Sequence, residues 1–436
     1  MTPLEIKAAL DAAIADAVAA RDNHAISKKD FTRSRKLPAD VMIKLLISME
    51  GGSLNKELHR AGIDVSAASF VERRKQLCWW DFENVLNGFN QRCAGCDNVR
   101  TYKGYHIFAV DGTTVNMPLN PKSESYMENK QDIRLSYNAI HATPIYDVYG
   151  KIYRTCCMQP QSKQDEIGAL LFMLAWYDFP PRTLIVGDRG FESQNLFCHF
   201  LEESNVDFLI RVKQNKGALR EIAKLPMQEL DTEISYTITT TQTNFDKGND
   251  FVFIQTRKNK NRAYSNNTKA SRWDFPSPYV MKFRVVRLML PTAQYVTFVT
   301  SLPSSFTIED IKHLYWLRWQ VELGFKEIKY SLGLVNLHGK SDEFVRQEIL
   351  AAMIMGNFCS RIINEVVIQQ AAQQLYSVNR KMAIHLCRQF LRAEDGDEKQ
   401  LLKEIAKYTE PIRPGRSDER NLKTKSFAGF VYRVSA

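Results

Sequence analysis

The sequence has no hydrophobic run long enough to cross a lipid bilayer. Its longest apolar run covers residues 167–177, well short of the roughly 20 residues that a membrane-spanning helix needs. The first 20 residues carry Glu5, Asp11 and Asp16, and this mixture of acidic and small apolar residues predicts an amphipathic helix rather than a signal peptide. We therefore expect a cytoplasmic protein without a membrane partner.

Paired metal-binding motifs are also scarce. The eight cysteines are scattered along the chain, which is typical of reduced thiols in the core of an intracellular protein. Cys93 and Cys96 have the spacing of metal ligands, but no second CxxC or HxxxH motif follows them. The spacing alone therefore does not favour a structural zinc site.

Positive charge is present in excess. Lysine and arginine total 59 against 49 aspartate and glutamate residues, so the net charge is +10. This excess favours a polyanionic partner. Hydrophobic residues make up 44% and charged residues 25% of the 436 positions, which is typical of a folded protein with two to four structural units.

Residues 1–100 are predicted to form a helical domain. Two short helices at 54–60 and 67–77 are joined by a small turn, an arrangement that resembles a helix-turn-helix DNA reader. The segment 28–36 is basic, and the second helix carries the candidate DNA contacts Arg73, Arg74 and Lys75. A small helical bundle with a solvated face explains the same pattern, so both interpretations stay open.

From residue 101 onward, short apolar strands and helices predict a mixed sheet backed by helices. Strand 106–110 runs into Asp111, and strand 183–186 runs through a glycine into Asp188. A carboxylate at the end of a strand is held rigidly and points into the crevice where ligands bind. Each aspartate alone is equally explained by a tight turn, because aspartate beside glycine is a common turn sequence.

The core is predicted to be divided between residues 101–212 and 301–370 by a β-rich insertion at 213–300. Within this insertion, residues 256–272 contain six cations and no acid. Such a loop is either a solvated hairpin tip or a surface that grips a nucleic-acid strand. Residues 371–436 are predicted to form a helical region with a basic tail.

A charged stripe marks the helix that follows the insertion. At about 100° per residue, Tyr315, Arg318, Glu322 and Lys329 lie within roughly 60° on one face. One carboxylate beside an arginine fork, a phenol and an ammonium group suits a metal ion and a phosphodiester. Lys326 on the same helix is a further candidate DNA contact.

This helix also has a purely structural interpretation. A charged stripe is typical of the solvent face of an ordinary amphipathic helix. In that case the opposite side, with Trp316, Trp319 and Leu323, would be buried. One helix does not decide between the two interpretations.

The two strand-end aspartates supply the partners that the helix would need. Asp111 and Asp188 on neighbouring strands would repel each other unless a divalent cation lies between them. Mg²⁺ takes oxygen ligands, and Glu322 is the candidate third carboxylate. Two ions about 3.5–4 Å apart would clamp the attacking and leaving oxygens of a phosphoryl displacement.

The ordered combination of these motifs resembles the DDE transposases of bacterial insertion sequences, in the family usually called the fourth. The tyrosine, arginine, glutamate and lysine of the charged stripe resemble the YREK signature of that family. The sequences VDGT at Asp111 and VGDRGF at Asp188 are similar to the surroundings of its two catalytic aspartates. The stretches 208–213 and 299–302 are similar to others in the family, and the resemblance covers about residues 28–430.

The resemblance implies an RNase H-like catalytic core interrupted by a β-rich insertion. Asp111, Asp188 and Glu322 would be the catalytic metal ligands for two Mg²⁺ ions, with Mn²⁺ as a substitute. Tyr315, Arg318 and Lys329 would hold the phosphate of the non-transferred strand. Water would hydrolyse one strand at each transposon end, and the freed 3′-hydroxyl would attack target DNA, with or without a hairpin intermediate.

The same resemblance implies the partners of the protein. They are double-stranded DNA, both transposon ends and target, and a second copy of the chain in a homodimeric DNA complex. The N-terminal region would bind the ends and the C-terminal region would help the two subunits pair. The protein would then associate with the bacterial nucleoid.

Two other functions fit parts of the sequence. An RNase H-fold nuclease without strand transfer would need no end-binding domain, so the basic N-terminal helices count against it. A domesticated DNA-binding relative would tolerate the loss of a metal carboxylate, and all three carboxylates are present. Trp273 in the insertion is either an ordinary packed tryptophan or one that stacks on a flipped base.

Overall fold

The computed structural model describes residues 1–23, 30–31, 36–95, 100–131, 136–202, 205–214, 219–243, 251–254, 272–290, 293–368, 370 and 375–412. Most of the basic segment 28–36, the loop 256–271, Cys96 and the tail beyond residue 412 therefore lie outside the described residues. Among the described helices, none combines the length and apolar character that crossing a membrane requires.

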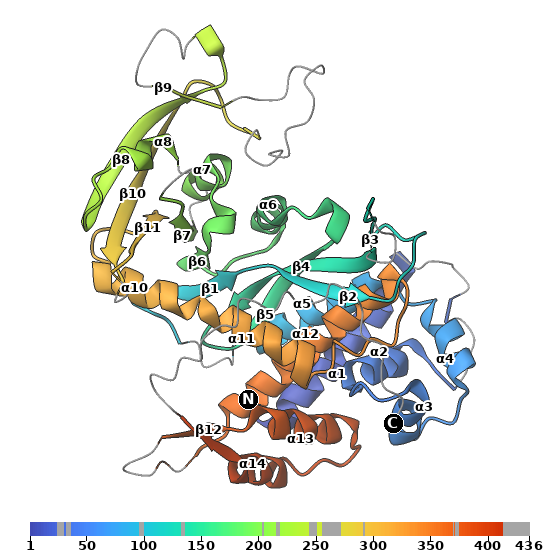
Figure 1. Ribbon diagram of the computed structural model, residues 1–436. Helices are drawn as coiled ribbons and strands as arrows, with labels where there is room; N and C mark the ends of the chain where they lie inside the picture. The colour runs from blue at the N-terminus through green and yellow to red at the C-terminus, as the bar shows by residue number, and fades with distance from the viewer. Residues whose placement is uncertain are drawn as a thin grey trace.

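A mixed sheet forms the centre of the molecule (Figure 1). Its first strands are β1 (His106–Val110), β2 (Thr113–Met117), β3 (Tyr126–Met127), β4 (Tyr137–Asp147), β5 (Ile152–Pro160), β6 (Thr183–Gly187) and β7 (Val206–Val212). The order β5–β4–β1–β6–β7 is antiparallel between β5, β4 and β1 and parallel between β1, β6 and β7. This order and direction are those of an RNase H-like core, and the predicted fold class is confirmed.

The strand residues alternate between the two faces of the sheet. In β1, Ile107 and Ala109 belong to one hydrophobic core, and Phe108 and Val110 belong to the other. This period of two follows from the pleat of a strand. Because both faces are covered, the strand reads in the sequence as a continuous apolar run.

Helices cover the two faces separately (Figure 1). Helices α6 (Glu166–Trp176) and α7 (Gln194–Glu202) lie on one face, where Leu170 and Phe197 are buried. The other face carries α5 (Trp79–Cys93) and α12 (Asp342–Asn364). The sheet is thus the middle layer of three.

The β-rich insertion extends the central sheet rather than forming a separate unit. Its strands are β8 (Leu230–Thr239), β9 (Phe251–Phe253), β10 (Tyr279–Met289) and β11 (Tyr295–Thr300), with the short helix α8 (Arg220–Ala223) before them. Strand β11 pairs antiparallel with β7, and the order continues through β10 and β8 to β9. The predicted strand-rich character of residues 213–300 therefore matches the structure.

Two consecutive helices follow the insertion, α10 (Ile308–Leu317) and α11 (Trp319–Lys326), and a π-helical turn at Glu327–Ser331 continues them. The C-terminal part contains α13 (Arg380–Arg392), α14 (Glu398–Lys407) and the paired strands β12 (Tyr376–Val378) and β13 (Thr409–Pro411). Helix α13 packs against α12, so the C-terminal part is attached to the helical layer that covers the central sheet.

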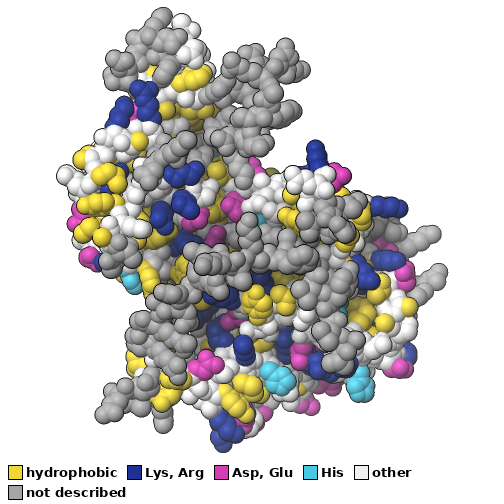
Figure 2. All heavy atoms as spheres, in the orientation of Figure 1, with side chains coloured by type: hydrophobic (Ala, Val, Ile, Leu, Met, Phe, Trp, Pro, Cys, Tyr) yellow, Lys and Arg dark blue, Asp and Glu magenta, His cyan; other side chains and the backbone are white. Residues whose placement is uncertain are grey.

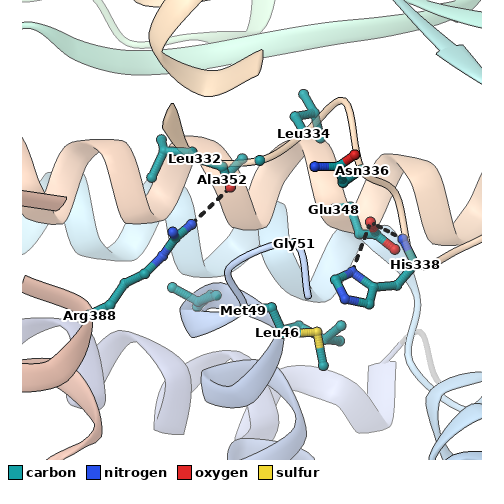
Figure 3. Close-up of a pocket in the computed structure, with 12 residues that line it drawn as sticks. Leu46, Met49, Gly51, Leu332, Leu334, Asn336, His338, Glu348, Ala352 and Arg388 are labelled. Carbon is teal, nitrogen blue, oxygen red and sulfur yellow. Dashed lines mark hydrogen bonds and ion pairs between the residues drawn. The ribbon is translucent and has the colours of Figure 1, made fainter. Parts of the chain in front are cut away.

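The N-terminal helices share a hydrophobic core with α12. They are α1 (Pro3–Ala19), α2 (Ala39–Ser48), α3 (Leu54–Arg60), α4 (Ala67–Arg74) and α5. Leu10 of α1 and Ile354 of α12 are both fully buried in the same core. Figure 3 shows the seam, where Leu46 and Met49 face the loop that carries Leu332 and His338. This packing joins residues 1–93 to the rest of the described chain.

Candidate active site

Asp111 lies at a break in one long extended segment. Strands β1 and β2 pair with the same edge of β4 in one continuous register, with Val110 opposite Ile145 and Thr113 opposite Ala142. Between them Asp111 and Gly112 leave the ladder, and Asp111 Oδ1 accepts a hydrogen bond from Gly112 N at 2.9 Å. The break turns the carboxylate out of the sheet while both flanking strands hold it in place.

Asp188 follows the adjacent parallel strand. Ala109 of β1 lies opposite Val186 of β6, so the two strands deliver Asp111 and Asp188 to the same edge of the sheet. Asp188 Oδ1 accepts a hydrogen bond from Gly190 N at 2.7 Å. This local bond fixes the side chain at the start of a short 3₁₀ turn.

Arg318 connects the sheet to the third predicted carboxylate. Its Nη1 lies 3.2 Å from Asp111 Oδ2, and its Nη2 lies 3.0 Å from Glu322 Oε1. Arg318 is only 7% exposed. Its guanidinium therefore holds Asp111 and Glu322 on opposite sides of one buried fork.

The three predicted catalytic carboxylates share one electrostatic environment. Burial raises the pKa of Asp111 to about 6; the charge of Arg318 and the Gly112 N–H oppose this rise, and the charges of Asp188 and Glu322 add to it. Burial alone would lower the pKa of Arg318, but Tyr315, Asp111 and Glu322 outweigh it and raise that pKa. The site thus has an acidic character that a cation relieves.

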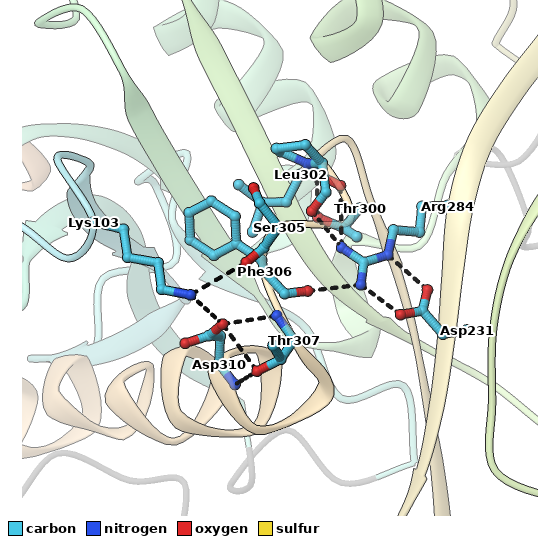
Figure 4. A network of polar contacts seen from close by, with 10 residues as sticks. Lys103, Asp231, Arg284, Thr300, Leu302, Ser305, Phe306, Thr307 and Asp310 are labelled. Carbon is cyan, nitrogen blue, oxygen red and sulfur yellow. Dashed lines mark hydrogen bonds and ion pairs between the residues drawn. The ribbon is translucent and has the colours of Figure 1, made fainter.

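A salt-bridge network anchors α10 and so positions Arg318 (Figure 4). Arg284 of β10 contacts Asp231 Oδ2 of β8 at 2.6 Å and donates to Phe306 O at 2.7 Å, just before α10 begins. Thr307 caps the helix through the N–H of Asp310, and Lys103 pairs with the Asp310 carboxylate. Thr307 is thus the N-cap of α10.

The purely structural interpretation of this helix pair is wrong. It required a buried side with Trp316, Trp319 and Leu323, yet these side chains are 64%, 38% and 44% exposed. The buried side instead carries Leu314 and Val321. The charged side, through Arg318 and Glu322, therefore faces the strand-end aspartate and not open solvent.

The other predicted DNA contacts on these helices lie in different surroundings. The ring of Tyr315 is 5.5 Å from the Arg318 guanidinium and packs against Phe298. Lys329 belongs to the π-helical turn, which breaks the 100° period, and burial lowers the pKa of its ammonium group. Lys326 lines a groove with Lys151 and Arg380. The regular spacing assumed from the sequence does not hold beyond residue 326.

The three N-terminal cations do not form one exposed DNA-binding surface. Arg74 is 1% exposed and contacts Gln347 Oε1, Glu348 Oε1 and Phe344 O within the protein. It is therefore not a surface residue, and we remove it from the expected DNA contacts. The other two lie at the surface side of α4: Arg73 stacks over Phe31 and bonds Leu37 O, and Lys75 pairs with Glu72.

Basic side chains are spread over the visible face of the molecule rather than gathered in one patch. Figure 2 shows lysine and arginine side chains interspersed with acidic ones. Trp273 is half-buried among Phe275 and Tyr279, and its indole N–H donates to Pro276 O at 3.2 Å. These contacts favour the packing role of Trp273.

The donor set fits a divalent cation. Carboxylate oxygens are the preferred ligands of Mg²⁺, and the charges of two further carboxylates, Asp188 and Glu322, act on Asp111. Within the part of the chain that the structure describes, no three acidic, histidine or cysteine side chains converge closely enough to hold a metal ion. The guanidinium of Arg318 stands between Asp111 and Glu322, so cation binding would require it to move.

Two further polar residues near the aspartates, Glu166 and His141, were not predicted from the sequence. Glu166 begins α6, and its Oε1 lies 2.9 Å from Nε2 of His141 on β4. Neither residue belongs to a motif of the charged stripe or of the strand ends. The pairing of β4 with β2 places His141 opposite Thr114, and the start of α6 supplies Glu166.

A family model described as the transposase DDE domain matches residues 102–358 of this chain. The match covers more than half of the sequence and includes all three predicted catalytic carboxylates. The chain belongs to the DDE transposase family. Transposases of this family act on DNA and generally use divalent metal ions.

Individual DDE transposases are similar over shorter stretches. The putative transposase InsL of element IS186A in Escherichia coli strain K12 is 37% identical over 84 residues, which cover 19% of this chain and 23% of that protein. The transposase of element IS421 from Escherichia coli gives the same values. The chain thus spans less than a quarter of the length of these curated relatives.

A solved structure is also similar. It is the cryo-EM structure of a piggyBac transposase synaptic complex with hairpin DNA. The similarity covers 95% of this chain and 78% of that one, with 13% sequence identity and a TM-score of 0.42.

Proposed function

We propose that this protein is a DNA transposase that cuts DNA at the ends of an insertion element and joins the freed 3′-hydroxyl to target DNA. The observation that carries the proposal is the Arg318 fork between Asp111 and Glu322, beside the strand that delivers Asp188. Half-buried carboxylates around one buried guanidinium, at a sheet edge in a DDE domain, suit phosphodiester chemistry better than a structural role.

Asp111, Asp188 and Glu322 are the residues that would hold Mg²⁺ or Mn²⁺, with two ions as the proposed number. When bound, these ions supply Lewis-acid stabilisation of the attacking and leaving oxygens. The protein side chains supply the rest by fixing the direction of attack. Arg318 is the residue with two functions, because its fork can leave the carboxylates and bind a DNA phosphate bidentately.

Tyr315 and Lys329 are proposed to assist Arg318 at the non-transferred strand. Tyr315 already contacts the guanidinium, so it can guide the fork as it moves. Lys326 is proposed to contact DNA from the groove that it lines with Lys151, Arg380 and Lys381, because these four cations outnumber the two carboxylates in the groove lining, Glu327 and Glu410.

Double-stranded transposon ends and target DNA are the proposed partners, bound by a homodimer. We propose that residues 1–100 bind the ends, with Arg73 and Lys75 as contacts, and that residues 371–436 help two subunits pair. The net charge of +10 supports a nucleic-acid partner and association with the bacterial nucleoid.

The decisive experiment follows end-labelled DNA that bears the ends of the element. Purified protein with Mg²⁺ should yield nicked, double-strand-cut and joined products in that order, and EDTA should abolish all three. A mutant with Asp111→Asn provides the matched control for contaminating nucleases. If the wild type cuts the ends but never yields a joined product, the protein is a nuclease without strand transfer.

A further inference from the structure

A fourth carboxylate, that of Glu166, lies beside the loops that carry Asp111 and Asp188. Glu166 Oε1 is 2.9 Å from His141 Nε2 and accepts a hydrogen bond from Gln164 Nε2 at 3.1 Å. His141 is only 3% exposed, and Thr114 Oγ1 lies 3.5 Å from its Nδ1. Strand β2, strand β4 and the start of α6 thus hold one carboxylate oxygen in a fixed position.

This carboxylate occupies the space between the two aspartate loops. A Cβ atom built at Gly112 would lie 2.1 Å from Glu166 Oε1 and 2.4 Å from His141 Nε2, so a larger residue next to Asp111 would displace these side chains. A Cβ atom at Gly190 would lie 2.9 Å from Asp188 Oδ1 and 3.5 Å from Glu166 Oε2. Glu166 Oε2 and Asp188 Oδ1 therefore both lie close to Gly190.

The helix does not need Glu166 as its cap. Asp165 is the N-cap residue of α6, and its side chain accepts from Gly168 N at 3.1 Å. A carboxylate near Asp111 and Asp188 adds negative charge to a site where the charges of Asp188 and Glu322 already contribute to raising the pKa of Asp111. Such a cost is typical of a functional site rather than of a structural ion pair.

We propose that Glu166, held by His141, is a catalytic general base that orients the attacking water and accepts its proton in the hydrolytic step of the proposed transposase reaction. The inference rests on that proposed function. In this step, a bond forms between the water oxygen and phosphorus while the bond from phosphorus to the 3′-oxygen breaks. The water proton passes to Glu166 Oε2, and the leaving 3′-oxygen takes a proton from solvent.

The joining step does not need the same group. There the nucleophile is the 3′-hydroxyl of the DNA, which the bound strand positions through its own phosphates. A residue that orients water therefore affects hydrolysis more than joining. A residue that only stabilises the fold affects both steps equally.

The test compares the two steps in the full-length protein. Glu166→Gln keeps the shape of the side chain, and we expect it to slow nicking of uncut ends by about 100-fold, in line with general-base effects. Joining from pre-cut ends should change less than about threefold on the same scale. Asp165→Asn is the matched control, because it removes the adjacent negative charge while keeping a capping side chain, and it should leave the ratio of the two rates unchanged.

Mn²⁺ binding, measured by calorimetry on the protein without DNA, provides the readout that does not depend on activity. Glu166→Gln should keep the affinity within about threefold, because the effect of the variant is on water, whereas Asp111→Asn should lose it. His141→Gln should shift the rate ratio in the same direction as Glu166→Gln and serves if that variant does not fold. Equal slowing of both steps, or no slowing, would overturn the inference, while a wild type that never joins DNA would overturn the proposed function instead.

Discussion

Arg318 is the residue on which the electrostatics of the site depend. Its fork lies 3.2 Å from one carboxylate and 3.0 Å from another, and its positive charge opposes the burial that raises the pKa of Asp111. A guanidinium in this place competes with a metal ion for the same oxygens. In the protein without DNA, the guanidinium charge thus partly offsets the charges of the carboxylates. A DNA phosphate would give the guanidinium an alternative partner.

This competition predicts an effect of Arg318→Ala on metal binding. In the absence of DNA, the variant should bind Mn²⁺ about tenfold more tightly, which corresponds to roughly 1.4 kcal/mol. Calorimetric titration measures the change, and Arg189→Ala, an exposed arginine next to Asp188, is the control that should change little. An unchanged affinity for Arg318→Ala would show that the fork does not compete with the metal.

The same residue should affect catalysis after the first nick. Arg318→Ala is expected to slow double-strand cutting and joining more than nicking, because the nick depends chiefly on the carboxylates. Arg318→Lys should restore only part of the rate, since a point charge replaces a bidentate fork. A labelled-DNA time course resolves the steps, and equal slowing of all of them would contradict this role.

At the scale of elements, the strands that carry the aspartates could be predicted from the sequence. For the helices that carry Arg318 and Lys329, the face on which each side chain lies could be predicted only up to residue 326. Buried strands 106–110 and 183–186 stand out as apolar runs that end at polar turns. The π-helical turn at 327–331 leaves no comparable signal in the sequence, so the surroundings of Lys329 could not be predicted. Glu166 was missed because β4 brings His141 to it across the sheet, and a long-range pairing has no local pattern.

The buried ion pair between Arg74 of α4 and Glu348 of α12 explains why the buried face of α4 could not be predicted from the sequence. Arg74 lies 2.9 Å from Glu348 Oε1 of α12, whereas a basic helix in a sequence suggests an exposed face. Burial alone would raise the pKa of Glu348, but Arg74 and His338 outweigh it and lower the pKa to about 2. The pair holds the N-terminal helices against α12.

This pair predicts a pH dependence of stability. Because the folded pKa of Glu348 lies below its ordinary value of 4.5, its contribution is present above about pH 4.5 and is lost as the pH falls toward 2. Glu348→Gln should reduce the free energy of unfolding by about 3 kcal/mol at pH 7, and the difference from the wild type should shrink in acid. Urea denaturation at several pH values measures it, and a difference that stays constant down to pH 2 would contradict the assignment.

At the scale of the whole molecule, the N-terminal helices, the sheet and the C-terminal helices form a joined body in the described chain. Leu10 and Ile354 lie in one hydrophobic core, although they are far apart in sequence. The regions predicted from the sequence therefore mark changes in composition and secondary structure, and they are not independent folding units. End binding and catalysis are therefore expected to be mechanically connected.

The shared core predicts how a distant substitution acts. Leu10→Ala should lower the free energy of unfolding by about 2–5 kcal/mol and shift one transition seen by both circular dichroism and tryptophan fluorescence. Leu4→Ala on the same helix is the matched control, because Leu4 is 45% exposed, and it should change stability little. Two separate transitions, with only one affected, would show that the N-terminal helices fold independently.

The most direct test of the central claim is whether a strand-end aspartate acts as a metal ligand. Asp188→Cys replaces oxygen by a softer sulfur ligand, which Mn²⁺ accepts more readily than Mg²⁺ does. Cleavage of labelled transposon ends by this variant should be abolished in Mg²⁺ and partly restored in Mn²⁺, while Asp165→Cys should stay active in both. Cleavage by Asp188→Cys at the wild-type rate in Mg²⁺ would contradict the metal site proposed here.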